Sequence, residues 1–359
     1  MEHPEASRRN RSGKKVSCLL LALLPLLAST FWYWGVRSKD LLATSTTFYT
    51  REPYENPKAL FVQGWLSEQS VLLSQAQSGD EYKCYALDTH TRRLQELPDL
   101  SASVHQAHVL PGSISPDGLW LVCYPLKPTS KGMIDYWQLE VNGRRRFRLR
   151  LSLSCEFAWS SDSKMCVGWG AQDFTIIKWP VATSGPVKPI DTWPGFRFAN
   201  AEPWEAKVAV LGATADALIL IPDVVTPPRM QLDELTLSLP PIRRRMASLA
   251  LNSVLDLGAY DVRLSPDACH LAYVVHHEAG RPGPPWLQRI KQLVGIKDSR
   301  YATLWTSRID GSNQREIGHL PDLPGFPEDK SIGGWGWDFH GRALWFEYNN
   351  RYLRTPPIY

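Results

Sequence analysis

The sequence predicts an all-β protein, a β-propeller of six blades of four-stranded antiparallel sheets, preceded by one N-terminal transmembrane helix. Three observations lead to this fold class. A turn motif recurs ahead of apolar strands, polar turns separate further strands, and one long uncharged stretch lies near the N-terminus. The first copies are spaced like propeller repeats, whose period is roughly 40–50 residues. A single sheet of this kind cannot bury both of its faces, so neighbouring copies must stack around an axis.

The clearest copy of the turn motif is Ser115-Pro116-Asp117-Gly118, which leads into the apolar run 119–124. Ser265-Pro266-Asp267-Ala268 and Ser160-Ser161-Asp162-Ser163 lead into similar runs. Proline presets φ at the second turn position, aspartate caps the turn locally, and glycine tolerates a positive φ. Each copy therefore indicates a tight turn between two strands of a repeated unit.

Three weaker copies, anchored at Leu66, Pro203 and Asp338, complete a set of six units. The fourth unit, at Pro203, lacks the Ser-Pro-Asp turn and is assigned by the apolar run 207–211 alone. The intervals that follow the fourth and fifth anchors are longer than one repeat and require insertions. One insertion is expected at 227–245, on a loop.

Further strands end in polar turns, as in the stretch 304–313, which closes with Asp310-Gly311-Ser312-Asn313. Together with the Ser115–Gly118 turn, this stretch resembles a unit of the TolB-like, WD-repeat-like β-propeller family. The resemblance covers roughly residues 60–359. It implies a propeller fold, and it supplies no catalytic residues.

The last unit is one strand short, since only 343–348 and 352–355 follow its turn as strands. The β-prone run 44–50 precedes the first unit. We expect this run to pair into the last blade and close the ring, which would cover an exposed sheet edge. A plain linker to the membrane segment is the alternative.

The N-terminal region predicts where the protein lies relative to the cytoplasmic membrane. Five basic residues within the first fifteen precede an uncharged stretch from Val16 to Val36, which as a helix would span about 31 Å. The stretch ends in aromatic residues, and fewer basic residues directly follow it than precede it. We therefore expect a basic cytoplasmic tail (1–15), a signal-anchor (16–36), a linker (37–59) and an extracytoplasmic, for example periplasmic, propeller (60–359). Export after cleavage of a signal peptide remains the alternative.

Composition agrees with an ordinary globular β body. The net charge is +4, most of which lies in the basic tail, so the propeller region is close to neutral and nucleic acid is not an expected partner. Five cysteines fall in the predicted propeller, none at zinc-site spacing: Cys84, Cys123, Cys155, Cys166 and Cys269. They are expected as small core residues, with a Cys155–Cys166 bridge as the alternative.

Two stretches are candidate partner-binding sites. In 144–151, the residues Arg146, Arg148 and Arg150 alternate with apolar residues, which places three guanidinium groups on one face of a strand. They indicate either an anion-binding row or an outer strand protected from edge pairing. In the second stretch, 286–297, apolar residues at helical spacing predict an amphipathic helix that docks a partner or packs on its own blade: Trp286, Leu287, Ile290 and Leu293.

Other motifs favour structural roles. His276 and His277 are adjacent on a strand and point to opposite faces, so no metal site is expected. The run 243–245 of arginines is expected in a solvated loop or at a helix start. Trp159 and Trp337 both directly precede a turn and are expected to pack between blades.

These observations predict a membrane-anchored, extracytoplasmic propeller that acts as a binding scaffold for a protein or a cell-envelope polymer. No cofactor and no catalytic residue is assigned. The alternative is a propeller enzyme, lactonase-like or glycan-active, that uses the central channel. Its carboxylates would come from inner strands, where Glu156 and Asp261 are the candidates.

Overall fold

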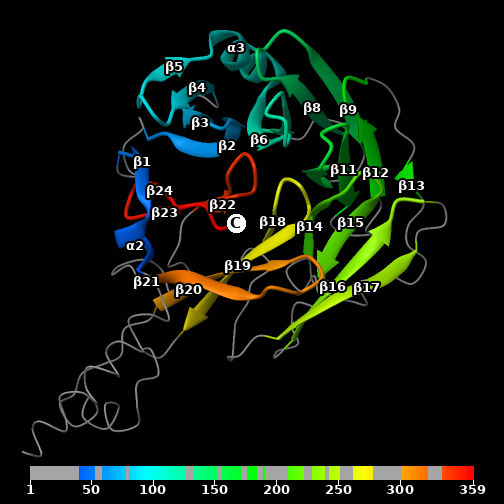
Figure 1. Cartoon of the computed structure of the whole chain (residues 1–359). Coiled ribbons are helices and arrows are strands. Elements are labelled where there is room, and N and C mark those ends of the chain that lie inside the picture. Colours follow the sequence, from blue (N-terminus) through cyan, green and yellow to red (C-terminus); the bar gives the residue numbers. More distant parts are fainter. Residues whose placement is uncertain are drawn as a thin grey trace, which may run out of the picture.

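The structure, a computed structural model, describes residues 40–52, 59–77, 81–126, 133–151, 155–170, 176–183, 189–190, 209–221, 229–238, 242–250, 262–277, 301–321 and 334–359. It consists of six four-stranded antiparallel sheets arranged as blades around a central axis (Figure 1). The predicted six-blade, all-β propeller is confirmed, whereas the predicted transmembrane helix lies outside the described residues. The inner strands of successive blades lie next to one another from blade 1 to blade 6.

Blades 1 to 3 follow one another along the chain, each from its inner to its outer strand. Their strands are β2 (Phe61–Ser67), β3 (Ser70–Ala76), β4 (Tyr82–Asp88) and β5 (Leu94–Glu96); β6 (Val109–Ile114), β7 (Trp120–Pro125), β8 (Ile134–Glu140) and β9 (Arg146–Leu151); and β10 (Cys155–Trp159), β11 (Met165–Gly170), β12 (Ile176–Pro180) and β13 (Pro189–Ile190).

Blades 4 and 5 continue this pattern, and blade 6 takes its outer strand from the start of the described chain. The strands are β14 (Ala209–Ala213), β15 (Ala217–Ile221), β16 (Arg229–Thr236) and β17 (Arg243–Ala250); β18 (Val262–Leu264), β19 (His270–His277), β20 (Tyr301–Arg308) and β21 (Arg315–Pro321); and β22 (Trp335–Trp337), β23 (Leu344–Tyr348), β24 (Arg351–Arg354) and β1 (Thr46–Thr50).

Strand β1 closes the ring as the sequence predicts. It pairs antiparallel with β24, from Thr46 opposite Arg354 to Thr50 opposite Arg351. Figure 1 shows β1 beside β24, next to blade 1. The last blade is therefore completed by a segment that precedes the first, so closure joins the two ends of the described chain.

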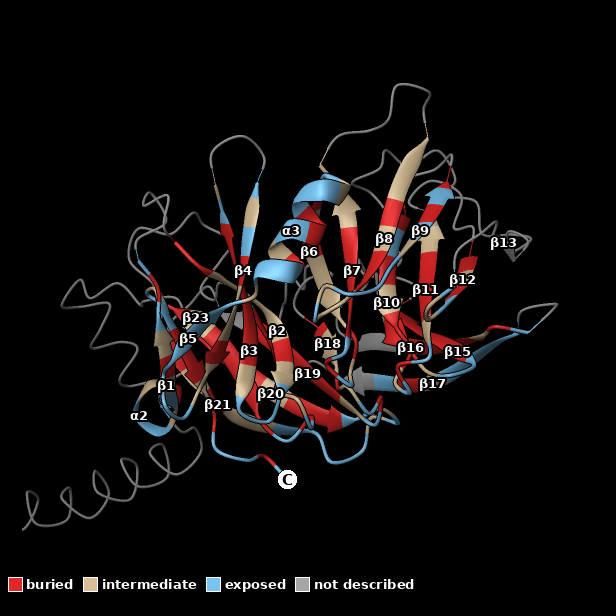
Figure 2. Cartoon of the chain, turned by 90° about the horizontal axis from the view of Figure 1, so that it is seen from above, coloured by how far each residue is buried: buried red, intermediate tan, exposed pale blue. Residues whose placement is uncertain are grey.

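Six apolar clusters hold the blades together, one at each interface between neighbours. Blades 1 and 2 share one cluster, blades 2 and 3 the next, and so on around the ring. The sixth cluster joins blade 1 to blade 6 through Phe48, Trp65, Val71, Trp345 and Tyr352. In Figure 2 the buried residues follow the strands between the blades. Each sheet thus hides its apolar faces against the next sheet.

The recurrent turn works through local hydrogen bonds. In blade 2 the Ser115 hydroxyl accepts from the Trp120 amide at 2.9 Å, and Asp117 accepts from the Leu119 amide at 3.0 Å. Gly118 has a φ of +72°, which glycine adopts readily. In blade 5 the serine and aspartate make equivalent bonds, but Ala268 occupies the left-handed position with a φ of +56°.

Exchanging the residue at this position should change stability in a predictable direction. Ala268→Gly should raise the free energy of unfolding by up to about 1 kcal/mol, because the left-handed conformation is strained for alanine. Gly118→Ala is the reverse control, and it should destabilise, since the new Cβ would lie 2.1 Å from the Leu66 carbonyl oxygen. Urea unfolding of both variants is the measurement. A loss of stability in Ala268→Gly would contradict this account of the turn.

The boundaries predicted for blade 4 were wrong. The run 207–211 was assigned to the strand after the turn, but β14, the inner strand, covers Ala209–Ala213 and the turn follows it. Thr214 and Asp216 form that turn, with the Thr214 hydroxyl accepting from the Ala217 amide at 3.0 Å. Threonine supplies the same hydroxyl as serine, so the turn forms without the Ser-Pro-Asp sequence.

The expected loop insertion at 227–245 was also wrong. Most of this stretch is β16 and the start of β17, the two outer strands of blade 4. Proline residues on both sides of a polar stretch suggested a loop. The outer strands, however, tolerate charged residues because one of their faces meets solvent.

In the part of the chain that the structure describes, two helices accompany the blades. Helix α3 (Pro98–Ala107) connects blade 1 to blade 2 and buries Leu100 and Val104 in their shared cluster. The short helix α2 (Leu41–Thr44) precedes β1 and is capped by Asp40, whose side chain accepts from the Leu42 amide. Within the described ranges no helix has the length and apolarity needed to cross a bilayer. The stretch from Val16 to Val36 lies outside those ranges, and its membrane span stays a prediction.

Trp159 and Trp337 join neighbouring blades, as expected from their common position. The Trp159 indole donates to the Ser113 carbonyl of blade 2 at 3.0 Å, and the Trp337 indole donates to the Arg263 carbonyl of blade 5 at 3.1 Å. Both side chains are buried. Each tryptophan therefore links its own inner strand to the inner strand of the preceding blade.

Candidate functional site

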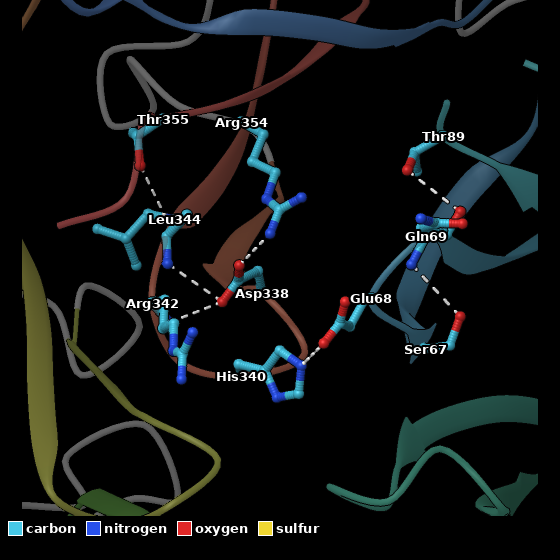
Figure 3. Close-up of polar contacts among 11 residues, drawn as sticks. Ser67, Glu68, Gln69, Thr89, Asp338, His340, Arg342, Leu344, Arg354 and Thr355 are labelled. Carbon is cyan, nitrogen blue, oxygen red and sulfur yellow. Dashed lines mark hydrogen bonds and ion pairs between the residues drawn. The ribbon is translucent and has the colours of Figure 1, made fainter. Parts of the chain in front are cut away.

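A cleft of about 640 Å³ lies at the seam where blade 6 meets blade 1. Figure 3 shows its polar contacts. Blade 1 contributes the two turns around Glu68 and Thr89, and blade 6 contributes its turn around His340 and the end of β24. The lining residues are Thr46, Phe48, Glu68, Gln69, Thr89, His90, Asp338, His340, Arg342, Ala343, Arg354, Thr355, Pro356 and Pro357.

Asp338 organises the blade 6 side of the cleft. It stands where blades 2, 3 and 5 have the turn serine, and its carboxylate accepts from the Arg342 and Ala343 amides at 2.8 and 3.1 Å. Its second oxygen pairs with the Arg354 guanidinium. That guanidinium also lies over the Trp65 ring of blade 1, 4.9 Å from the ring centre. A buried carboxylate thus replaces a hydroxyl and positions an arginine at the seam.

Across the cleft, Glu68 of blade 1 contacts the His340 imidazole of blade 6 (Figure 3). Both side chains are exposed, and an exposed ion pair contributes at most about 1 kcal/mol. Within blade 1, the Thr89 hydroxyl donates a hydrogen bond to the Gln69 carbonyl at 3.1 Å. Glu68 and Asp338, the two carboxylates of the cleft lining, both have cationic or imidazole partners: the Glu68–His340 pair connects the two blades, and the Asp338–Arg354 pair lies within blade 6.

The outer strand of blade 2 has a different electrostatic balance. The burial pattern of β9 alternates, with Arg146, Arg148 and Arg150 exposed and Leu149 and Leu151 buried against blade 3. Arg150 donates two hydrogen bonds to Asp135, at 2.7 and 2.9 Å. Through these bonds the guanidinium holds the pKa of the Asp135 carboxyl below its ordinary value.

The other two arginines of β9 are ordered without a carboxylate of their own. Arg148 lies 3.9 Å from Asp135 and 5.8 Å from the centre of the Trp137 ring. Arg146 donates to the neutral Gln106 side chain of helix α3 at 2.9 Å. Among the described residues, the three guanidinium groups of this strand face therefore have one carboxylate beside them, Asp135, which contacts two of the three.

This difference distinguishes the two sites. In the cleft, two carboxylates face two arginines and two histidines, and one ion pair joins the two blades while the other lies within blade 6. On β9, positive charge exceeds negative charge, and the arginines are exposed and positioned by their neighbours. We therefore consider the β9 arginine face, defined as Arg146, Arg148 and Arg150, the better candidate for binding an anionic partner.

The second predicted site lies outside the described residues. Trp286, Leu287, Ile290 and Leu293 all fall in the interval 278–300, between β19 and β20. The amphipathic helix stays a prediction. Only the arginine part of the predicted partner-binding set is therefore described.

The arginine run 243–245 forms neither a loop nor a helix start, which corrects that expectation. It begins β17, the outer strand of blade 4. Arg243 and Arg245 both pair with the buried Asp233 on β16. Side chains two residues apart on a strand point to the same face, so both arginines can form ion pairs with the one carboxylate.

The five cysteines of the described residues are free thiols. The Cys155–Cys166 bridge is not formed. On the paired strands β10 and β11, Cys155 lies opposite Gly170 and Cys166 lies opposite Trp159, so the two cysteines are at opposite ends of the pair. Burial raises the pKa of the Cys84 thiol to about 12, which keeps it protonated at neutral pH.

The channel residues of the enzyme hypothesis are partly described. Glu156 is exposed on β10, and Asp261 lies outside the described ranges. In the described portions of the six inner strands, Glu156 is the one acidic residue. His276 and His277 end β19, and the part of the chain that is described contains no cluster of three metal-ligating side chains.

Sequence reasoning did not find the seam cleft. Its walls come mainly from residues between 46 and 90 and between 338 and 357, which meet only when the ring closes. One signal was present in the sequence, since Asp338 replaces serine at the first position of the turn motif. A carboxylate at a position that is otherwise a hydroxyl indicates a cationic partner.

Solved structures with a similar chain path include β-propeller domains. An uncharacterized protein from Listeria monocytogenes EGD-e matches with a TM-score of 0.49 and 14% identity over 84% of this chain and 93% of that chain. A putative TolB from Agrobacterium tumefaciens matches with a TM-score of 0.41 and 14% identity over 74% and 83%. The β-propeller domain of Cps50 (Swd1) from Myceliophteria thermophila matches with a TM-score of 0.44 and 10% identity over 86% and 98%.

The likeness to these structures concerns the fold alone. No family model and no curated protein matches the chain. Six four-stranded blades, three of them with the serine–aspartate turn between the first two strands, agree with the resemblance to TolB-like and WD-repeat-like propellers. At the level of the fold, the resemblance is confirmed.

Proposed function

We propose that the chain is a membrane-anchored, extracytoplasmic β-propeller that acts as a binding scaffold for an acidic partner, a protein segment or a cell-envelope polymer. The anchor is the stretch from Val16 to Val36, and the binding surface is the β9 arginine face. A closed ring suits this role, because a rigid body presents loops and strand edges at fixed positions.

The observation that carries the proposal is the row of exposed arginines on β9. Arg146, Arg148 and Arg150 lie on one face of an outer strand, where Asp135 contacts Arg148 and Arg150 and the neutral Gln106 accepts from Arg146. Guanidinium groups bind carboxylates and phosphates in a planar, two-bonded geometry. Because Trp137 and Gln106 already hold two of them, little conformational entropy is lost when an anionic chain binds along the row.

Binding of a polyglutamate probe tests this site. Full-length protein in detergent should bind the probe with an affinity that falls as salt rises, and replacing Arg146, Arg148 and Arg150 by glutamine should weaken binding by about tenfold or more, at up to about 1 kcal/mol per exposed contact. Replacement by lysine should give an intermediate loss, since lysine keeps the charge and loses the planar geometry. Isothermal titration calorimetry with the probe measures the affinities of the unmodified protein, the glutamine variant and the lysine variant.

The matched control removes three exposed cations elsewhere, in the variant Arg93→Gln, Lys164→Gln, Arg308→Gln. These residues belong to blades 1, 3 and 5. If the control weakens binding as much as the β9 variant does, net charge explains the effect and the β9 arginine face is not the site. Equal binding by the β9 variant and the unmodified protein would also contradict the proposal.

Topology is tested by protease treatment of intact cells that produce the full-length chain. The expected result is cleavage of the propeller from outside the cytoplasmic membrane while the basic tail, residues 1–15, stays protected. Release of the propeller into the soluble extracytoplasmic fraction without protease would favour signal cleavage over anchoring.

A further inference from the structure

One face of the ring collects the exposed apolar side chains. We define the turn face as the end of the propeller that carries the connections between the first and second strands and between the third and fourth strands of each blade. Of the residues that the structure describes, four large apolar side chains are exposed: Leu94 (42%), Leu119 (58%), Ile242 (48%) and Tyr359 (48%).

All four lie on the turn face. Leu119 belongs to the turn between β6 and β7, Leu94 begins β5 after the β4–β5 turn, and Ile242 precedes β17 after β16. Tyr359 stacks on His270, the first residue of β19, with ring centres 4.2 Å apart. Figure 2 shows the C-terminus at one face of the ring and helix α3 toward the opposite face.

Each of these side chains lies near a cation. Leu94 follows Arg93, and Ile242 precedes Arg243. The Arg315 guanidinium lies 5.0 Å from the centre of the Tyr359 ring. The Val141 amide donates to the Leu119 carbonyl at 2.9 Å, which brings the turn containing Arg144 beside Leu119. Apolar side chains next to arginines are typical of surfaces that rest on a lipid bilayer.

Acidic residues on the same face are largely engaged in the turns. Asp88 accepts from the His90 and Thr91 amides, and Asp310 accepts from the Ser312 amide. Asp117, Asp162 and Asp267 accept from turn amides in the same way. These carboxylates therefore stabilise the turns of this face.

The start of the described chain lies at the same face. Strand β1 begins with Thr46 opposite Arg354, and the segment after β24 continues to Ile358, whose amide donates to the Arg342 carbonyl in the turn of blade 6. Leu41 of helix α2 shares a buried cluster with Ile358. The backbone of Asp40 forms an isolated parallel β-bridge with His319 of β21, so the chain is fixed to the propeller from this residue onward.

The length of the tether decides which surface meets the membrane. Asp40 comes four residues after Val36, and a fully extended chain of this length spans at most about 14 Å. Resting on the proposed anchoring, we infer that the turn face lies against the bilayer, with Leu94, Leu119, Ile242 and Tyr359 inserted at the lipid headgroup level. Glu81, which precedes β4 at the opposite end of blade 1, then belongs to the side that faces away from the lipid.

Fluorescence quenching in vesicles tests the orientation. Cys269 is an exposed thiol on the turn face, while the other described cysteines are buried. Full-length Cys18→Ala protein, labelled at Cys269 and reconstituted in phosphatidylcholine vesicles, should lose most of its fluorescence when the lipids carry a headgroup quencher. The control carries the label at the β3–β4 connection on the opposite face, through the exposed Glu81→Cys in a Cys18→Ala, Cys269→Ser background, and should lose little.

Two further measurements separate the possible failures. Flotation of the vesicles reports anchoring: protein that does not float with them overturns the anchoring proposal and this inference with it. Protein that floats but is quenched equally or more at position 81 overturns the orientation and leaves anchoring intact. The variant Leu119→Ser, Ile242→Ser should float normally and show weaker quenching at Cys269; unchanged quenching would remove these side chains from the contact.

Discussion

Phe48→Ala is expected to lower the free energy of unfolding by about 3–5 kcal/mol. Phe48 is 5% exposed and belongs to β1, the strand that completes blade 6. Its ring lies 5.7 Å from Trp65 of blade 1 and 6.2 Å from Tyr352 of blade 6, so the substitution opens a cavity where the ring closes. Urea or thermal unfolding of the full-length protein measures the loss.

The control for Phe48→Ala lies on the same strand. Thr50 is exposed, and Thr50→Ala should change the free energy of unfolding by no more than about 0.5 kcal/mol. If both variants have the stability of the unmodified protein, β1 behaves as a linker and the seam does not depend on it.

The second large effect is expected from Arg51→Met. Arg51 follows β1 and is buried, and its guanidinium pairs with Glu347 on β23 and donates to Asn350 at 3.0 Å. Removing the arginine leaves the Glu347 carboxylate, whose side chain is 13% exposed, without this partner. Breaking a buried pair from one side typically costs about 3–5 kcal/mol, which chemical denaturation would show as a lower midpoint.

A double variant distinguishes the charge from the packing. In Arg51→Met, Glu347→Leu neither charge is buried, and the introduced methionine side chain would still pack on the Phe61 ring that the guanidinium now covers at 5.0 Å. Stability should return to near that of the unmodified protein. A double variant as unstable as Arg51→Met would mean that the side-chain shape, and not the unpaired carboxylate, causes the loss.

The sequence predicted the parts of this fold that depend on local chemistry. In the turns of blades 2, 3 and 5, a serine and an aspartate bond to amides within five residues, so the motif and the structure it forms are contiguous. The missing strand of the last blade could be recognised from the strand count. The tryptophans before two of the turns could be assigned to blade packing because they recur at one position.

The parts that were missed depend on contacts between distant residues. Nothing adjacent to Arg243 and Arg245 indicates that Asp233 lies opposite them, and the run was therefore assigned to a loop. Helix α3 is short and its apolar face is narrow, so its role between blades 1 and 2 appears only when both blades are present. The turn of blade 4 was missed because threonine and alanine replace serine and proline.

The β9 arginine face shows a limit of a different kind. Alternation alone predicted which side chains would be exposed, and the structure confirms it. It could not show that Asp135, Trp137 and Gln106 hold the arginines in place, because these residues lie on another strand and on a helix. The excess of positive charge, on which the proposed binding depends, follows from that count of partners.

Hydrogen exchange at the seam tests the closed ring most directly. In full-length protein, the amides of β1, Thr46–Thr50, should exchange about as slowly as those of β24, Arg351–Arg354, because the two strands pair along their length. Mass spectrometry of peptides that cover each strand gives the comparison. Exchange of the β1 amides at the rate of an unfolded peptide, while β24 stays protected, would contradict closure by this strand.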